Sequence, residues 1–465
     1  MGMGEDWMRN TKYRFESFML FDYDGVAKHL EKMAAKGWRF EKVGSIFWKY
    51  KKAEPANVKY SVTFAPDASE YDPEPTERQK SMEEYCKEAG WEKVGSLAQM
   101  QIFCSENPDA VPVDTDEAMR LAVTQKAMRK NFIPTHILLL FVFVMNAFNQ
   151  YTFGKRDWTG YFAENSKLWL WGIILWGFFL VIYEMLYYFA WLMGAKKAVA
   201  NGKKCPSPSG YRKVHKVTNV TLVLLLAGLL ASYSTAMLIY EVTFLAGYFG
   251  IIAVVNAVRN HLKKDGVSRH SNMAVTLAVD IVLAFALVFG LTFGVIGIGL
   301  GREEKEPVRY YETDNHLWEI YEDTLPLTVQ DFVETDYPNY SYEAEEKTSI
   351  LVSAGEYRQR SFPDGENAPG LYYEIVTVKV DWLYDFFLND FMKKEFRYLD
   401  ADEIGEYQRI DVAVAEGIQV YRQYINKIPS ANEWLLRTGD KIIALWLDFE
   451  PTEAQLKLMA DTLVR

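Results

Sequence analysis

The fold of this chain depends first on Val217–Val258, which reads VTNVTLVLLLAGLLASYSTAMLIYEVTFLAGYFGIIAVVNAV and has Glu241 as its single charged residue. One membrane-spanning helix needs about 20 apolar residues. This stretch of 42 residues is long enough for two, and it predicts a tight pair of spanning helices near 217–238 and 240–258.

Three further apolar runs predict spanning helices near 133–153, 168–193 and 273–300. The first carries no charged residue, the second carries only Glu184, and the third carries only Asp280. Buried helices of a soluble protein are the alternative, but five segments of spanning length in one part of the chain disfavour it. We therefore expect a five-helix transmembrane bundle with the lipid bilayer as a partner.

The chain resembles a soluble acidic protein only on average. Its 465 residues are 49% hydrophobic and carry a formal charge of -11, a composition too apolar for a disordered chain. The charge is uneven, at -2 over residues 1–131, +8 over 132–300 and -17 over 301–465. These blocks predict a multi-domain integral membrane protein with a folded α+β domain on each side of the bundle. The expected domains are 1–118, 119–300 and 301–465.

The basic residues of the short loops predict the orientation, because loops rich in lysine and arginine stay in the cytoplasm. The loops 194–216 and 259–272 hold most of these residues in the apolar block. We therefore expect a multi-pass cell-membrane protein whose N-terminus is cytoplasmic and whose C-terminus is extracytoplasmic. The cysteines agree, because Cys86, Cys104 and Cys205 all fall in segments assigned to the reducing cytoplasm.

Residues 13–106 alternate between strand-like and helix-like patterns. Asp22 or Asp24 can cap a helix that runs to Lys36, and Gly37 is placed to end it. The order β-α-β-β-α-β predicts a ferredoxin-like α+β domain. Its elements are expected at Tyr13–Phe21, 22–36, Phe40–Tyr50, Val58–Phe64, Glu77–Ala89 and Ser96–Cys104.

A short repeat within this block supports the prediction. Gly37-Trp38, followed by Val43-Gly44-Ser45, is echoed by Gly90-Trp91, followed by Val94-Gly95-Ser96, and each copy comes at the end of a helix. Packing of each tryptophan beneath its own helix end is the favoured interpretation. A ligand platform made by the two rings is the alternative.

Three segments of this block carry a family resemblance: Phe21-Asp22-Tyr23, Met33-Ala34-Ala35-Lys36-Gly37-Trp38 and Glu88-Ala89-Gly90-Trp91-Glu92. Together they resemble the bacterial membrane family catalogued as domain of unknown function 2812. The resemblance covers roughly residues 12–106, with the multi-span region as a usual companion. It implies a Gram-positive-type bacterial inner membrane protein, often encoded beside PadR-like transcriptional regulators, and it brings no catalytic residue.

Residues 301–465 predict an α+β domain. Tyr372–Val380 alternates as a strand, Trp382–Lys394 fits an amphipathic helix, and Thr452 caps a last helix. Hairpins are expected at 410–424 and 434–449. The charge of -17 suits a cationic ligand such as a basic peptide or a metal ion, although solubility beside an anionic membrane is the favoured explanation.

No motif in the sequence predicts an enzyme. The six histidines form no HExxH or similar metal pair, and there is no GxxxxGK[ST] phosphate loop and no GxSxG elbow. Acidic pairs such as Glu345-Glu346 and Asp402-Glu403 are expected to be solvated surface unless the fold brings them together. We therefore predict no catalytic, cofactor-binding or metal-binding residue, and no cofactor.

Glu184 and Asp280 are the candidate polar site within the membrane. A carboxyl group in a spanning helix costs about 2.5–3.5 kcal/mol, so it usually faces protein or water. The two residues lie at matching distances along the chain from basic loops. A shared proton or cation site is one interpretation. The favoured one is a hydrogen bond from each carboxyl group to a neighbour such as Tyr183, Asn219 or Asn256.

The fifth span holds the candidate helix-packing residues Gly290, Gly294, Gly297 and Gly301, which give two GxxxG spacings. Such spacings let two helices approach closely. Close packing without a signalling role is the favoured interpretation, because glycine is common in membrane helices.

The architecture favours a non-enzymatic sensor or regulatory protein, in which the bundle links an outer domain to a cytoplasmic one. A component of a transport or antimicrobial-resistance system is the alternative, and an outer-face enzyme comes third. A protein partner or extracellular ligand is expected without being identified, no nucleic acid partner is predicted, and a homo-oligomer is left open.

Overall fold

The computed structural model describes residues 10–464, except 17, 20, 45–46, 98, 209–210, 299–304, 314–315, 363–367, 395, 397–398 and 400–402. The chain divides into two compact units. The N-terminal unit comprises Met1–Val144, Ile173–Ala227 and Tyr233–Gly301, and the C-terminal unit comprises Met145–Gly172, Gly228–Ser232 and Arg302–Arg465. Helices α5 (Phe132–Gly154) and α7 (Asn165–Ala200) contribute residues to both units.

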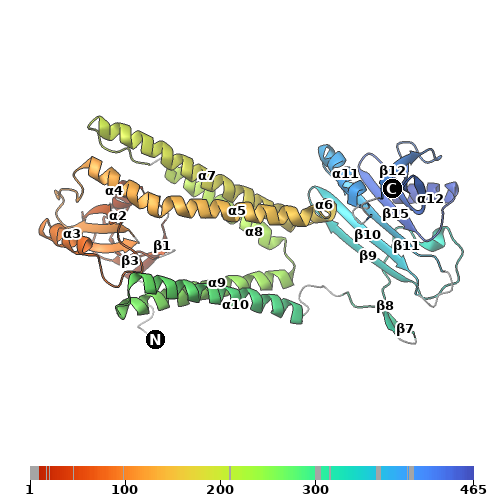
Figure 1. Ribbon diagram of the computed structural model, residues 1–465, viewed down its shortest axis with the longest axis horizontal. Coiled ribbons are helices and arrows are strands. Elements are labelled where there is room, and N and C mark those ends of the chain that lie inside the picture. Colours follow the sequence, from red (N-terminus) through yellow and green to blue (C-terminus); the bar gives the residue numbers. More distant parts are fainter. Residues whose placement is uncertain are drawn as a thin grey trace. The chain divides into compact units, whose positions relative to one another are not determined.

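Within the described residues, five helical segments are long and apolar enough to cross a membrane, which equals the number of apolar helices predicted. Two of them include α5 and α7, and the other three lie within α8 (Tyr211–Ala231), α9 (Thr235–Lys264) and α10 (Arg269–Ile298). Helices α9 and α10 lie side by side (Figure 1). The predicted break near residue 239 is wrong, because α8 already ends at Ala231. The Ser234 side chain accepts a hydrogen bond from the Met237 amide at 3.4 Å and caps α9 there.

The N-terminal domain is built from two copies of a β-α-β-β unit. The first copy is β1 (Thr11–Phe15), α2 (Tyr23–Ala34), β2 (Trp38–Lys42) and β3 (Phe47–Lys52). The second is β4 (Lys59–Phe64), α3 (Glu77–Glu88), β5 (Glu92–Leu97) and β6 (Met100–Ser105). Each copy forms an antiparallel three-stranded sheet of the same order, β1-β3-β2 and β4-β6-β5.

The repeat seen in the sequence therefore marks a structural duplication. Gly37 and Gly90 both have a positive φ, 78° and 81°, at the ends of α2 and α3, as predicted for Gly37. Both hairpins carry a register shift at the same place after their tryptophan, between Phe40 and Lys42 and between Lys93 and Gly95. Trp91 is buried against Cys86 of α3, which confirms its predicted packing.

The predicted strands Phe40–Tyr50 and Ser96–Cys104 are wrong as single strands. Each copy instead folds back as a hairpin. Gly44 lies between β2 and β3, β5 ends at Leu97 before β6 begins at Met100, and Gly95 lies at the bulge of β5. A glycine inside a strand pattern marks a bulge or turn more often than a continuous strand. The observed order is β-α-β-β-β-α-β-β, and the ferredoxin-like arrangement is not confirmed.

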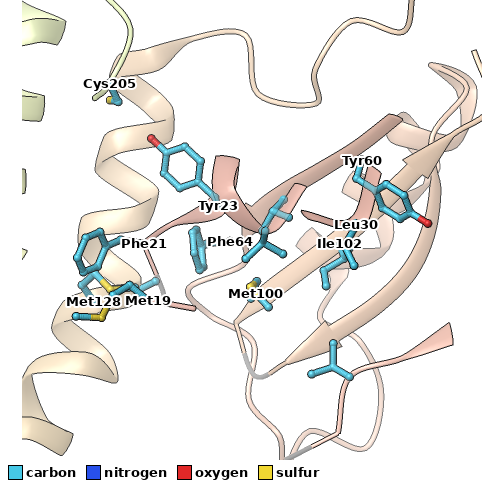
Figure 2. Close-up of a cluster of buried hydrophobic side chains, with 14 of the residues drawn as sticks. Met19, Phe21, Tyr23, Leu30, Tyr60, Phe64, Met100, Ile102, Met128 and Cys205 are labelled. Atoms are coloured by element: carbon cyan, nitrogen blue, oxygen red, sulfur yellow. The ribbon is translucent and has the colours of Figure 1, made fainter. Parts of the chain in front are cut away.

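The core of the N-terminal domain continues into the apolar helices. Figure 2 shows Phe21 and Met19 beside Met128 of α4 (Glu117–Lys130), and Tyr23 pointing toward Cys205. The same cluster includes Trp191 of α7, whose ring centroid lies 4.8 Å from that of Phe21. The domain and the ends of these helices therefore share one apolar core.

The C-terminal unit contains a seven-stranded antiparallel sheet of order β12-β13-β14-β15-β11-β10-β9 (Figure 1). Helix α11 packs on one face together with α6, a short helix of the segment between α5 and α7. Helix α12 packs on the other face. The strands are β9 (Ser341–Thr348), β10 (Val352–Arg360), β11 (Leu371–Val378), β12 (Gly405–Ile410), β13 (Gln419–Ile425), β14 (Ile428–Arg437) and β15 (Lys441–Leu447). The helices are α6 (Trp158–Phe162), α11 (Tyr384–Lys394) and α12 (Glu453–Leu463), and a separate pair of strands is β7 (Arg309–Thr313) with β8 (His316–Ile320).

Most elements predicted for this unit are confirmed. The strand near 372–380 is β11, the helix near 382–394 is α11 with a preceding turn of 3₁₀ helix, and the hairpin near 434–449 joins β14 to β15. Thr452 caps α12 through the amide of Gln455. The bounds predicted for the hairpin at 410–424 are wrong. The observed hairpin joins β12 to β13, and residues 411–418, which include Gly417 with φ 89°, form its connecting loop.

Candidate functional site

The register of the large sheet places three glutamates in one row. Glu356 on β10 lies directly opposite Glu345 on β9 on one side and opposite Glu374 on β11 on the other. Directly paired residues of adjacent strands point to the same face of a sheet. Like charges in such pairs are destabilising, so this row is not explained by the stability of the sheet.

Helix α6 lies on the face that carries the glutamate row. Asp157 caps this helix by accepting a hydrogen bond from the Gly160 amide at 3.0 Å. The Trp158 amide donates to Asp390 of α11 at 2.8 Å, and Ala163 is buried in the cluster between α11 and the sheet. These contacts hold the segment between α5 and α7 firmly against the C-terminal domain.

A pocket of about 450 Å³ opens between α6 and the glutamate row. Its wall includes the end of α5, the start of α7, α6, and strands β9, β10 and β11. Acidic side chains outnumber basic ones in this wall, because five carboxylates face two amines. The charged lining residues are Asp157, Glu164, Lys167, Glu345, Lys347, Glu356 and Glu374.

One of the lining carboxylates, Glu374, belongs to a buried ion pair. Glu374 is 1% exposed and accepts a hydrogen bond from Lys394 Nζ at 3.0 Å, and the same amine lies 3.5 Å from an Asp157 carboxylate oxygen. Burial raises the pKa of Glu374 to about 7, although Lys394 opposes the shift. Burial works against the charge of Lys394, but Glu374 and Asp157 outweigh it and raise the pKa of this amine.

The upper part of the pocket is more open and carries weaker pairs. Lys347 lies 3.0 Å from Glu345 and 3.8 Å from Glu164, while Lys167 lies 3.5 Å from Glu164. The Glu356 side chain is exposed. This wall therefore suits an ammonium or guanidinium group, because the five carboxylates still outnumber Lys167, Lys347 and the neighbouring Lys394. Among the described residues, no cluster of three or more His, Cys, Asp or Glu is placed to hold a metal ion.

The structure places the predicted polar residue Glu184 inside a hydrogen-bonded cluster. His136 Nε2 of α5 lies 2.8 Å from Glu184 Oε2, and the Tyr211 hydroxyl group of α8 donates to Glu184 Oε1. His215 Nδ1 lies 2.7 Å from the Tyr211 oxygen and 3.8 Å from Glu184 Oε1. Glu184 is thus hydrogen-bonded to neighbouring side chains, as the favoured interpretation expected. These neighbours are His136 and Tyr211 and not Tyr183, Asn219 or Asn256.

Asp280 occupies a different environment. Its side chain is exposed on α10, and it is not among the residues that the structure gives as contacts of Glu184. The proton or cation site shared by these two carboxyl groups stays a prediction.

The predicted packing glycines are only partly described. A Cβ atom built on Gly290 would have no described atom within 4 Å, and Gly301 lies outside the described residues. Gly294 and Gly297 lie within α10, and their packing role stays a prediction. Helices α9 and α10 approach closely at Gly247 instead, where a Cβ would lie 2.4 Å from Leu287 Cδ1.

Sequence reasoning missed the residues that surround both sites. His136 and His215 are 48 and 31 positions from Glu184 along the chain, so a search for closely spaced metal pairs could not connect them. In the sequence, the three glutamates of the row appear only as separate acidic residues within strand-like segments. One signal in the sequence could have pointed to the Glu184 cluster. His136 and His215 both lie near the start of an apolar helix, and Glu184 lies within another.

Comparison with known proteins gives a family match for the N-terminal part of the chain. Five apolar helices and two α+β parts are consistent with a multi-domain, multi-pass membrane protein. Residues 22–135 match the model of the family described as Protein of unknown function (DUF2812), which confirms the resemblance inferred from the sequence. Neither the curated proteins nor the solved structures gave a match. The family match runs from α2 into α5, so it includes neither Glu184 nor the acidic pocket.

Proposed function

We propose that this chain is a non-enzymatic sensor or regulatory protein of a bacterial cell membrane. In this proposal a cationic ligand, or a basic segment of a partner protein, binds in the acidic pocket of the C-terminal unit. Its binding changes the state of the N-terminal domain. Loop charges favour a cytoplasmic N-terminal domain and an extracytoplasmic pocket.

The observation that carries the proposal is the make-up of the pocket wall. Gln150 and Phe153 of α5 and Leu170 of α7 contribute to it alongside the sheet. Helix α5 also carries His136 and helix α7 also carries Glu184, and these two side chains are in contact. A ligand in the pocket therefore touches both helices that lead to the polar cluster and to the core of the N-terminal domain.

The test uses the full chain in lipid nanodiscs with a short lysine-rich peptide as the probe. We expect Glu345→Gln and Glu356→Gln each to weaken peptide binding about 1.5- to 5-fold, because an exposed ion pair contributes about 0.2–1 kcal/mol. Glu416→Gln is the matched control, since Glu416 is exposed on the same unit and lies outside the pocket. Equal affinity in all four proteins would remove the pocket from the proposal.

The second half of the test asks whether binding reaches the N-terminal domain. Hydrogen exchange of α2 is measured with and without saturating peptide. We expect the exchange of α2 to change in the wild-type protein and to change less in the Glu345→Gln, Glu356→Gln double variant. Peptide that binds without any change in α2 would contradict a sensor.

A component of a transport system is the second candidate, and the Glu184 cluster is the observation that favours it. Ionisable groups inside spanning helices often mark ion or substrate pathways. In proteoliposomes, solute flux that depends on the protein and is lost in Glu184→Gln would favour transport over sensing.

A further inference from the structure

The hydrogen bonds of His136 define how many protons the Glu184 cluster holds. His136 Nδ1 lies 2.8 Å from the carbonyl oxygen of Phe132. A carbonyl oxygen can only accept, so Nδ1 must carry a hydrogen atom. Without a further proton, His136 Nε2 is therefore an acceptor.

A second acceptor faces this nitrogen. Glu184 Oε2 lies 2.8 Å from His136 Nε2, a distance typical of a hydrogen bond. An ionised carboxylate and an unprotonated imidazole nitrogen would both present lone pairs to each other. The contact therefore requires one proton between them, either as imidazolium with carboxylate or as imidazole with carboxylic acid. Both forms leave the pair neutral, which suits a low-dielectric environment.

The other oxygen of Glu184 connects to a second histidine. Tyr211 donates its hydroxyl hydrogen to Glu184 Oε1, and its oxygen can accept from His215 Nδ1 at 2.7 Å. A proton bound at His215 can then reach Glu184 by two transfers. His215 Nδ1 gives its proton to the tyrosine oxygen, and the tyrosine hydroxyl gives its own to Oε1. The transfer starts from the imidazolium–carboxylate form of the Glu184–His136 pair, because only that form leaves a carboxylate to accept the proton. Tyr211 ends neutral, His215 returns to neutral imidazole, and Glu184 becomes a carboxylic acid beside the charged His136.

Other titratable groups surround the cluster on every element packed there. Tyr183 and Tyr187 of α7 lie beside Tyr211, at ring centroid distances of 6.2 and 5.4 Å. Tyr188, one turn beyond Glu184, interacts electrostatically with Arg129 of α4, and Tyr187 does so with Asp22. His136 on α5 and His215 on α8 complete the set. The set therefore contains Asp22 and Arg129 as further charged groups beside Glu184 and the two histidines.

We propose that Glu184, His136, Tyr211 and His215 form a proton-binding site within the helices of the N-terminal unit, with one proton shared between Glu184 and His136. This proposal goes beyond the proposed function, because it does not need a ligand in the acidic pocket. A change in the protonation of this site would reach the N-terminal domain through direct ring contacts. The ring of His136 lies 3.8 Å from that of Phe132, whose ring contacts Phe21 of the N-terminal core at 6.1 Å.

The experiment is pH-difference infrared spectroscopy on the full chain in nanodiscs. The wild-type spectrum minus that of Glu184→Gln should contain a carboxyl band and a histidine ring band that change with the same midpoint, because they share one proton. Asp280→Asn is the matched control, since it removes a carboxyl group from another spanning helix outside the cluster. Its titration of the Glu184 bands should equal that of the wild type.

Tyr211→Phe provides an independent variant that keeps the aromatic ring. Loss of the tyrosine hydroxyl should move the midpoint of the Glu184 band by about one to two pH units, as expected for a lost hydrogen bond to a charged group. This arm stands even where Glu184→Gln does not fold. Carboxyl and histidine bands that titrate independently, or a midpoint unchanged in Tyr211→Phe, would overturn the proposal.

Discussion

Glu374 on β11 accepts a hydrogen bond from Lys394 on α11 at 3.0 Å while only 1% of Glu374 is exposed. Glu374 lines the acidic pocket, and Lys394 also lies 3.5 Å from Asp157 of the segment between α5 and α7. The sheet, the helix that covers it and that segment thus meet at one buried charge. Changes in the charge of Glu374 are expected to affect all three.

The first prediction concerns pH. Burial raises the pKa of Glu374 from its ordinary value of 4.5 to about 7 in the folded protein. Between these values the folded state keeps a proton that the unfolded state has lost, so stability falls as pH rises. The contribution is complete below about pH 4.5 and lost above about pH 7. Over this window the loss amounts to about 3 kcal/mol.

Glu374→Gln isolates this contribution, because glutamine resembles the protonated acid in shape and has no charge. Hydrogen exchange of the β11 amides, compared between the two proteins at each pH, is the measurement. We expect the variant to gain protection relative to the wild type as pH rises toward neutrality. A difference that does not vary with pH would show that Glu374 titrates normally.

The second prediction concerns the contact between the N-terminal domain and α7. Phe21 is fully buried, and its ring lies near those of Trp191 and Tyr188, with centroids 4.8 and 5.3 Å away. Phe21→Ala should destabilise the N-terminal unit by about 3–5 kcal/mol, because it removes a buried aromatic ring and leaves a cavity. Thermal unfolding in detergent, followed by tryptophan fluorescence, is the measurement.

Phe15→Ala is the matched control for this change. Phe15 is 58% exposed, so its truncation should alter stability by about 0.5 kcal/mol or less. Similar losses in both variants would mean that Phe21 does not hold the domain against the helix.

The third prediction concerns the start of α12. The Thr452 hydroxyl group accepts from the Gln455 amide at 3.3 Å, and the Gln455 side chain accepts from the Thr452 amide at 2.8 Å. Thr452→Ala should cost about 0.5–2 kcal/mol through the loss of this cap. Faster hydrogen exchange in the first turn of α12 would report the loss, and Thr452→Ser should restore the wild-type rate. Equal rates in all three proteins would speak against the cap.

The fourth prediction concerns orientation. Residues 301–465 contain no cysteine, so Lys457→Cys adds a single thiol to an exposed position of α12. If the C-terminal unit lies outside the cell, a membrane-impermeant maleimide will label this variant in intact cells. Labelling only after lysis would reverse the proposed topology. The unmodified chain measures the background from Cys86, Cys104 and Cys205.

The sequence predicted the parts of this fold that depend on local pattern. Charge-free runs identified the spans, Gly37 marked the end of α2, and Thr452 marked the start of α12. It did not predict that each copy ends in a hairpin, because Phe40–Tyr50 and Ser96–Cys104 each also fit the pattern of one strand. Distinguishing a long strand from a hairpin at these positions requires the pairing partners, which come from other segments.

The acidic pocket and the Glu184 cluster also depend on contacts between distant segments, which the sequence alone does not show. Glu345, Glu356 and Glu374 are neighbours only through the register of β9, β10 and β11. The sequence showed three acidic residues in alternating segments and could not show that they share a row. Glu184 was identifiable because a carboxyl group is rare in a spanning helix. Its partners His136 and Tyr211 depend on how three helices pack.

The hydrogen bond from the Trp158 amide to Asp390 has a consequence for biosynthesis. The two residues are 232 positions apart, so the ribosome completes α6 long before it makes the surface on which α6 rests. Until β11 and α11 emerge, Phe162 and Ala163 lack the apolar surface on which they pack in the folded chain, although Asp157 can already cap α6 through Gly160. We therefore expect truncation after α10 to leave α6 without the surface on which it packs, so that proteases cut the segment between α5 and α7 faster than in the full chain.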